Sequence, residues 1–239
     1  MVAAVILAGG QGTRIRHLHP ETPKPLIEVA SKPWLEWLLL YLRGQGVSEV
    51  VVSAGHLADK INLFIEQRRN VFPGISAVVE VEPRGTAGGF LHAAELGAIQ
   101  SDEILVMNGD SLALCPLGPL LECLREPNTQ GALLGLEMED ASRYGTLSFS
   151  DDGNLSAFME KRPGAGVINA GVYLFKKKLL ANFSKKLPLS FEFDVFPELI
   201  AGGNQIKVVA CAGDFIDIGT EASLSDAGAF IDRNREWFL

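Results

Sequence analysis

The sequence predicts an α/β fold in which helices flank a mixed, mostly parallel central sheet. Short apolar runs rich in β-branched residues alternate with helical patterns through about residue 112, as in successive βαβ units. The chain has 239 residues, of which 47% are hydrophobic, so one large core can be buried. Because no linker, repeat or low-complexity segment divides residues 1–239, we expect a single domain. Its parts are a first half over about 1–112, a second half over about 113–220 and a closing helix over 221–239.

Seven short apolar runs predict buried strands. They are Ala3–Ala8, Glu49–Ala54, Ala77–Val81, Ile104–Met107, Ala132–Leu136, Val167–Phe175 and Ile206–Ala210. The helices are predicted from a strongly apolar, an amphipathic and an alanine-rich segment, and from a closing segment near the end of the sequence. In that order they are Pro33–Leu42, Leu57–Arg69, Ala87–Ala98 and Ala222–Phe238. After the alternating half, Tyr144–Ser150 and Leu155–Glu160 flank an Asp-Gly turn and predict an antiparallel hairpin, so a second, mixed lobe follows.

Charge and cysteine content narrow the classes of protein to consider. The formal net charge of −8 argues against nucleic acid and membrane surfaces as partners. The three cysteines form no paired framework and no C-x-x-C motif, so neither a disulfide nor a zinc site is predicted. Met1–Ala8 lacks a basic flank and reads as a strand rather than a signal peptide. We therefore expect a cytoplasmic protein, and the sequence leaves a homodimer open.

The segment Leu7–Arg14, LAGGQGTR, is the most informative in the chain. A strand ends in a glycine-rich turn, after which a helix is expected to begin, so several backbone N–H groups can converge on phosphate oxygens. Arg14 adds a forked cation suited to phosphate. The Walker A pattern is absent, and Ile15 stands where the Rossmann fingerprint needs its third glycine. A structural βα turn is the competing interpretation.

Lys24 is the second candidate phosphate ligand. It lies between Pro23 and Pro25, which bias the backbone to extended geometry and would present the lysine rigidly. A solvated loop lysine is the alternative, and the glycine loop ten residues earlier favours a phosphate clamp.

With these two elements, the sequence resembles the sugar-1-phosphate nucleotidylyltransferase family. Further segments match the family in order. They are Glu82–Gly89, Asn108–Asp110, Tyr144–Gly145, Glu160–Lys161, Asn169–Gly171 and Phe215–Thr220. The matches extend over about residues 3–220. The short length, Phe191–Asp194 and Phe215–Gly219 most resemble the D-glycero-α-D-manno-heptose 1-phosphate guanylyltransferase subgroup.

The resemblance implies a Rossmann-like nucleotidyltransferase fold with a smaller sugar-binding lobe after a nucleotide-binding half. It implies an enzyme of the EC 2.7.7 class, in which NTP and sugar 1-phosphate give NDP-sugar and pyrophosphate. Arg14 and Lys24 would be catalytic. The nucleotide-binding residues that the resemblance implies are Leu7, Ala8, Gly9, Gly10, Gly12, Thr13, Glu82, Gly85, Thr86 and Asn108. The sugar-phosphate ligands would be Gly145, Glu160, Lys161, Asn169 and Glu192.

Asp110 and Asp217 are the predicted metal ligands. Asp110 closely follows an apolar strand, where open α/β sheets place ligands, and Asp217 lies in a similar apolar context. Mg²⁺ is commonly held by one or two carboxylates together with substrate phosphates and waters. A strand-end turn and a helix cap are the alternative roles for the two aspartates, and the family match favours the metal.

Glu82 favours GTP as the nucleotide. Guanine presents two adjacent donors, N1–H and N2–H₂, and a carboxylate is a double acceptor. Uracil and thymine offer one donor on that edge, while adenine and cytosine place an acceptor beside their amino group. Arg84 stands where the family often has leucine.

Alternative functions remain open at this point. Within the class, these are a mannose-1-phosphate guanylyltransferase and a uridylyltransferase such as that for N-acetylmuramate 1-phosphate. A GT-A-like glycosyltransferase would share the fold and a metal-binding aspartate, but Asn108-Gly109-Asp110 lacks the usual Asp-x-Asp. A nucleotide-sensing relative is disfavoured because Lys24, Asp110, Lys161 and Asp217 are all present.

Overall fold

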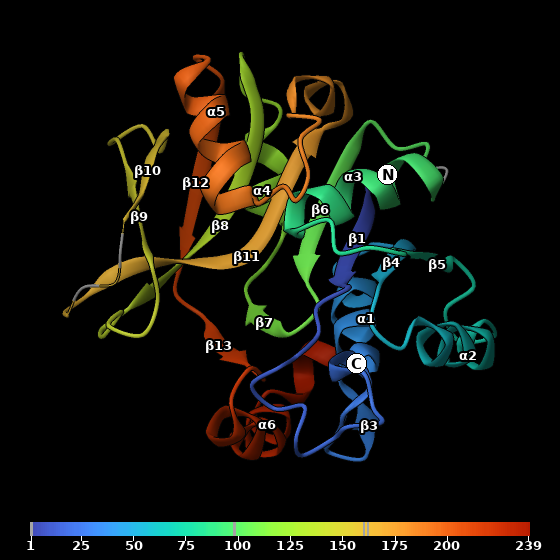
Figure 1. Ribbon diagram of the computed structural model, residues 1–239. Helices are drawn as coiled ribbons and strands as arrows, with labels where there is room; N and C mark the ends of the chain where they lie inside the picture. The colour runs from blue at the N-terminus through green and yellow to red at the C-terminus, as the bar shows by residue number, and fades with distance from the viewer. Residues whose placement is uncertain (1, 98, 160, 162) are drawn as a thin grey trace.

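The computed structural model describes residues 2–97, 99–159, 161 and 163–239, and one large sheet runs through it (Figure 1). Its first part contains four parallel strands in the order β6-β1-β4-β5. They are β1 (Ala3–Ala8), β4 (Glu49–Ala54), β5 (Ile75–Val79) and β6 (Glu103–Asn108). The predicted α/β class with a mostly parallel sheet is confirmed, because buried, β-branched strands alternate with helices here.

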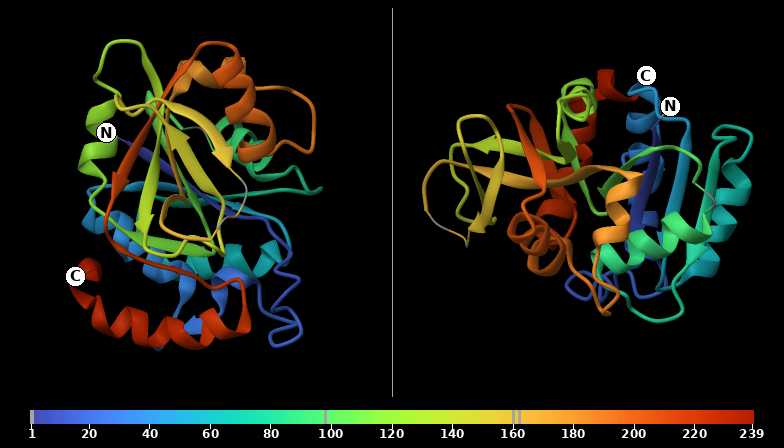
Figure 2. Two further views of the ribbon diagram at one scale, coloured as in Figure 1. Left: turned by 90° about the vertical axis from the view of Figure 1, so that its left-hand side faces the viewer. Right: turned by 90° about the horizontal axis from the view of Figure 1, so that it is seen from above.

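The sheet continues into the second half through β11 (Gly166–Lys176), which pairs antiparallel with β6. On β11 follow β8 (Thr129–Met138), which is antiparallel to it, and β12 (Gln205–Cys211), which is parallel to β8. The predicted hairpin is present as β9 (Thr146–Phe149) and β10 (Leu155–Met159), and it joins β11. The right view of Figure 2 shows this hairpin in yellow and helix α2 in blue-green at opposite ends of the molecule.

Helices cover both faces of the sheet, and successive residues of β1 show the division. Ala4 and Ile6 belong to one buried cluster and Ala3 and Val5 to the other, as strand alternation requires. The first cluster includes residues of α1 (Trp34–Gly44), α2 (Ala58–Arg68), α4 (Gly118–Cys123) and α6 (Glu221–Arg233). The second includes residues of α3 (Thr86–Leu96) and α5 (Phe196–Ala201).

Shorter elements complete the chain. They are η1 (Lys24–Leu26), β2 (Glu28–Val29), β3 (Lys32–Pro33), η2 (Lys177–Asn182), η3 (Phe191–Val195) and η4 (Arg235–Phe238). The predicted closing helix is α6 followed by η4, because Asn234 leaves helical geometry at φ −116°. Within the described part of the chain, no helix combines the length and apolar character needed to cross a membrane.

A small antiparallel sheet was not predicted. It consists of β7 (Ser111–Leu114) and β13 (Asp214–Asp217), with Ser111 opposite Asp217. Each strand has only four residues, too few for an alternating pattern to stand out. The pairing matters because Asp110 directly precedes β7 and Asp217 ends β13.

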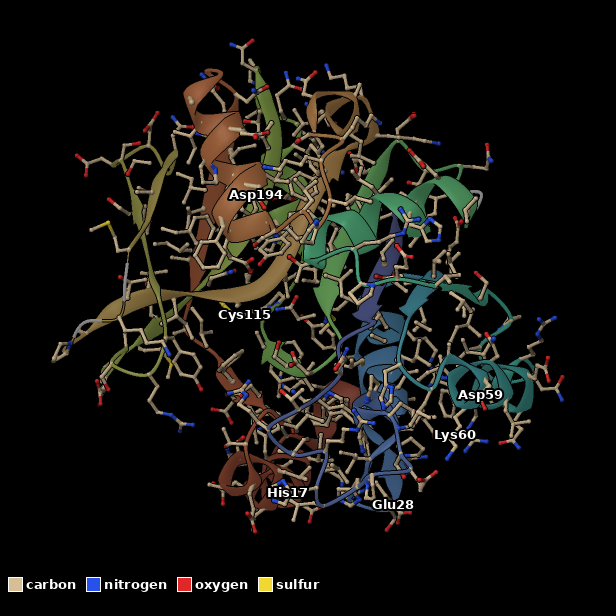
Figure 3. The ribbon with its side chains drawn as sticks, viewed as in Figure 1. His17, Glu28, Asp59, Lys60, Cys115 and Asp194 are labelled. Carbon is tan, nitrogen blue, oxygen red and sulfur yellow. A yellow bond between two sulfur atoms is a disulfide. The ribbon has the colours of Figure 1, made fainter. Side chains whose placement is uncertain are left out.

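The expectation that the chain has no disulfide is wrong, because Cys115 and Cys211 are bonded across 96 residues. Cys115 follows β7 and Cys211 ends β12, shortly before β13, so the strand pairing brings the two Cα atoms to 6.7 Å. Figure 3 shows Cys115 near the middle of the molecule. Sequence spacing alone does not reveal pairing over such a distance. Cys123 is a free thiol.

The helix expected directly after the glycine turn is also wrong. Residues 9–23 contain turns and no α-helix, and the next element is the short η1. Pro20, Pro23 and Pro25 explain this, since each lacks an N–H donor and disfavours helical geometry in the residue before it. A ligand bound at this loop would therefore contact backbone N–H groups of turns and not the N-terminus of a helix.

Candidate active site

A cavity of about 440 Å³ lies at the carboxyl ends of β1, β5 and β6, the edge where open α/β sheets bind ligands. Twelve predicted site residues line it. They are Leu7, Ala8, Gly9, Gly10, Gly12, Thr13, Arg14, Lys24, Gly85, Thr86, Asn108 and Asp110. Seven lining residues were not predicted. They are Gln11, Pro25, Glu80, Pro83, Arg84, Gly109 and Gly219. Six predicted residues lie outside the lining, namely Glu82, Gly145, Lys161, Asn169, Glu192 and Asp217, and Glu160 lies outside the described residues.

The glycine loop forms one wall of this cavity. Gly12 has a φ of +57°, a left-handed conformation that glycine adopts without steric cost, and its carbonyl accepts the N–H groups of Ile15 and Arg16 at 3.0 Å. The backbone N–H groups of residues 9–14 donate to no partner within the described part of the chain. These donors are therefore available to an anion, as the sequence predicts.

Two cations of the loop region lie beside the two predicted metal ligands. The Nζ of Lys24 is 2.6 Å from Oδ2 of Asp110, and the lysine side chain is only 10% exposed. A Cβ added to Gly219 would lie 2.8 Å from both Nη2 of Arg14 and Oδ1 of Asp217. The guanidinium and the second carboxylate thus flank the same glycine, and a larger residue there would displace them.

Backbone pairing brings the main chains around Asp110 and Asp217 together. The N–H of Ile218 donates to the carbonyl of Asp110 at 2.8 Å, which extends the register that places Ser111 opposite Asp217. The Asp217 carboxylate accepts the N–H of Gly219 at Oδ1 and the hydroxyl of Tyr144 at Oδ2, at 3.0 and 2.9 Å. Burial, and then the hydrogen bond to Asp217, raises the pKa of Tyr144 to about 12, so its hydroxyl stays protonated and donates.

The donor set of this pair fits a magnesium ion that is also bound by phosphate. Among the residues that the structure describes, no group of three or more acidic, histidine or cysteine side chains gathers. A self-sufficient protein cage is therefore absent from that part of the chain. Mg²⁺ is usually bound by one or two carboxylates together with substrate phosphates and waters, and Asp110 and Asp217 supply that number.

Glu80, which the sequence reasoning passed over, is the acidic residue of the β5–α3 loop that lines the cavity. Its Oε1 accepts the hydroxyl of the fully buried Ser53 at 2.6 Å, and an added Cβ at Gly9 or Gly89 would lie 2.6 Å from the same oxygen. Glu82, the residue chosen from the sequence, is exposed and does not line the cavity. The two glutamates are two positions apart in the sequence. The path of the loop determines that Glu80 lines the cavity and Glu82 does not.

A side-chain network between β11 and η3 joins two of the predicted sugar ligands. The Tyr173 hydroxyl accepts Nδ2 of Asn169 at 2.8 Å and donates to Oε1 of Glu192 at 3.0 Å. Burial, and then the Glu192 charge, raises the pKa of Tyr173 well above its usual value. The Asn108 amide packs directly against Gly171, whose N–H donates to Asn169, so this network adjoins the end of β6. Gly145 and Lys161 are exposed.

The sequence matches the family described as "Nucleotidyl transferase" over residues 3–234. The chain belongs to this family. The nucleotidyl transferase match covers both halves of the sheet and every cavity residue named above.

Relatives within the family are named as mannose-1-phosphate guanylyltransferases. The catalytic subunit beta of Drosophila melanogaster is 32% identical over 222 residues, which are 90% of this chain and 59% of the relative. The Mycobacterium tuberculosis enzyme is 31% identical over 222 residues, 92% of this chain and 61% of the relative. The chain thus spans about three fifths of the length of these curated relatives.

Solved structures give a full-length match. The crystal structure of HddC from Yersinia pseudotuberculosis has a TM-score of 0.86 at 30% identity and covers 97% of this chain and 100% of HddC. A second HddC structure, complexed with GMP-PN, has a TM-score of 0.85 at 31% identity with the same coverage. The fold of this chain therefore matches that of HddC over nearly all of both chains.

Proposed function

We propose that this protein transfers the guanylyl group of GTP to a sugar 1-phosphate, forming a GDP-sugar and pyrophosphate. The observation that carries the proposal is the convergence on one cavity of the glycine loop, Arg14, Lys24 and Asp110, with Asp217 directly behind Gly219. Free N–H groups, two cations and two carboxylates are the groups that phosphoryl chemistry uses. The nucleotidyl transferase family match and the named relatives support this reading.

The chemistry needs alignment and charge neutralisation more than proton transfer. A phosphate oxygen of the sugar 1-phosphate attacks the α-phosphorus of GTP in line, a new P–O bond forms, and the bond to the β-phosphate oxygen breaks to release pyrophosphate. The nucleophile is already anionic, so no general base is required. Arg14 and the loop N–H groups would bind the departing β- and γ-phosphates, and Lys24 would exchange its carboxylate partner for phosphate oxygens.

Asp110 and Asp217 would hold Mg²⁺ in this reaction. The ion would neutralise negative charge on the nucleotide phosphates when bound. The Tyr144 hydroxyl and the Gly219 N–H hold the Asp217 carboxylate in place, as their hydrogen bonds of 2.9 and 3.0 Å indicate. The Lys24–Asp110 ion pair keeps the other carboxylate compensated until the nucleotide arrives.

The preference for GTP rests on Glu80 rather than on Glu82. Ser53 orients the Glu80 carboxylate, which lines the cavity beside Gly85 and Thr86. A carboxylate accepts two adjacent donors, and guanine presents N1–H and N2–H₂ side by side. One of the HddC structures is a complex with GMP-PN, which supports the same base.

For the acceptor, we propose D-glycero-α-D-manno-heptose 1-phosphate, on the resemblance noted in the sequence, with Asn169 and Glu192 recognising hydroxyl groups. Lys161, Gly145 and Glu160 belong to the same proposed subsite. Mannose 1-phosphate is the second candidate, because the relatives are named for it. We also propose a cytoplasmic location. The redox conditions of that compartment would then determine whether Cys115 and Cys211 are bonded or are free thiols.

The test is an assay of pyrophosphate release over a grid of GTP, UTP, CTP and dTTP against heptose, mannose, glucose and N-acetylmuramate 1-phosphates. We expect release with GTP and a manno-configured acceptor, and none when MgCl₂ is replaced by EDTA. Preferential turnover of UTP would overturn the base assignment. Transfer or hydrolysis of a GDP-sugar without pyrophosphate exchange would overturn the reaction class.

A further inference from the structure

Arg84 lines the nucleotide cavity but has no assigned task. Its Nε atom is buried and has no hydrogen-bond partner, and its side chain forms no ion pair within the described residues. A buried polar nitrogen without a partner destabilises the protein that contains it. The Arg84 guanidinium therefore has no protein partner within the described residues, and at the wall of a ligand cavity its N–H groups can donate to a bound ligand.

The backbone around Arg84 is fixed on both sides. The N–H of Glu80 donates to Ala54 at 2.7 Å, and the carbonyl of Arg84 accepts the N–H of Leu189 at 2.8 Å. A Cβ added to Gly88 would lie 3.0 Å from the Cβ of Arg84, so the stem of the side chain packs on the first turn of α3. Arg84 thus begins at the same end of the cavity as Glu80, on the loop that carries Gly85.

We propose that Arg84 is a specificity-determining residue that donates hydrogen bonds to O6 and N7 of guanine while Glu80 accepts from N1–H and N2–H₂. This rests on the proposed guanylyl transfer and deepens its base choice. Arginine pairs with the O6 and N7 acceptors of guanine through its two-pronged donor geometry. Glu80 and Arg84 are four positions apart on one loop. The Glu80 carboxylate therefore matches the guanine edge that carries N1–H and N2–H₂, and the Arg84 guanidinium matches the adjacent edge that carries O6 and N7.

The same pair disfavours the other bases. Adenine presents an amino donor at position 6, which would face the Arg84 donors, and cytosine presents an amino donor at position 4. Uracil has the single acceptor O4 and no N7. Arg14 and Lys24 occupy the phosphate end of the cavity, beside Asp217 and Asp110, so the phosphates have cations of their own.

The experiment compares wild type, Arg84→Leu and the matched control Arg125→Leu, which changes an exposed arginine outside the cavity. Binding of GTP, 7-deaza-GTP, ATP and UTP is measured by calorimetry without acceptor, and kcat/KM for GTP is measured with acceptor. Removing N7 should weaken binding to wild type and to Arg125→Leu. Arg84→Leu should bind GTP about 5- to 150-fold more weakly than wild type and should no longer distinguish the two nucleotides.

Several results would overturn the assignment. An Arg84→Leu variant that still discriminates against 7-deaza-GTP would show that another group contacts N7. Equal losses for GTP, ATP and UTP would place Arg84 on the phosphates or ribose, and unchanged GTP affinity would show no ligand contact. Thermal unfolding of the variant checks that the fold is retained. If GTP binds as expected but no acceptor releases pyrophosphate, the proposed reaction fails and the base contact stands.

Discussion

The two sides of the site are built in opposite ways. On the proposed nucleotide side, the candidate ligand groups are loop N–H donors without partners in the described part of the chain and charged side chains that pair across the cavity, as Lys24 does with Asp110. On the proposed acceptor side, Asn169 and Glu192 are already joined through hydrogen bonds to the Tyr173 hydroxyl. Tyr173 is fully buried and packs on Phe191 and Phe196, with ring centroids 4.8 and 5.2 Å away.

This difference matches the two tasks. Phosphates carry charge that shifts during the reaction, so their ligands must exchange partners as pyrophosphate leaves. A sugar is recognised by neutral hydroxyl groups, for which the direction of each hydrogen bond matters more than the total charge. The comparison predicts that changes to the phosphate and metal ligands lower kcat, whereas changes on the acceptor side raise the KM of the sugar phosphate.

The largest effect is expected for Asp217→Asn. This substitution keeps the side-chain shape and an acceptor oxygen for the Gly219 N–H, and the new amide N–H can donate to the Tyr144 hydroxyl oxygen. It removes the charge that would hold Mg²⁺. We expect kcat to fall about 10²- to 10³-fold, the size of losing one electrostatic contact to the reacting phosphates. The kcat is measured as the rate of pyrophosphate release at saturating concentrations of both substrates. Asp214→Asn on the same strand is the matched control and should keep its activity, because Asp214 contacts Arg233 and Asn234 instead.

A folded Asp217→Asn variant with wild-type kcat would contradict the two-carboxylate site. Manganese titration followed by electron paramagnetic resonance gives a second readout, since the variant should bind Mn²⁺ more weakly even without substrate. Equal Mn²⁺ affinity in Asp217→Asn and Asp214→Asn would move the metal away from β13.

The intermediate effect is expected for Tyr173→Phe on the acceptor side. Removing the hydroxyl leaves Asn169 and Glu192 without the group that orients both. Because one or two hydrogen bonds are lost, the KM of the sugar 1-phosphate should rise about 5- to 30-fold, with kcat and the KM of GTP nearly unchanged. Tyr41→Phe, which removes a buried hydroxyl bonded to the Cys115 carbonyl, is the control and should leave both KM values as they are. A fall in kcat in place of the rise in KM would erase the contrast between the two sides.

The sequence predicts the strands and the loop on the nucleotide side far better than it predicts the pairing of β7 with β13. Alternating apolar strands and a glycine loop are local patterns, so β1, β4 and the loop up to Arg14 follow from short-range rules. The β7–β13 pairing joins residues about a hundred positions apart and leaves no local signal. Glu80 and Glu82 could not be separated for a related reason: beyond Val79 the chain leaves the strand, and no periodicity says which carboxylate faces the cavity.

The smallest effect on activity is expected for Cys115→Ser, which removes the link between β7 and the end of β12. If each side acts through its own contacts, kcat and both KM values should stay within about twofold of wild type, while the oxidised wild type should be more stable than the variant by about 2–4 kcal/mol. Chemical denaturation with and without reductant measures this, and reductant should have no effect on the variant. Cys123→Ser, which removes the free thiol, is the control. A kcat that falls on reduction of the wild type and in Cys115→Ser alike would mean that the link positions Asp110 and Asp217 through the small sheet, and the two sides would no longer be independent.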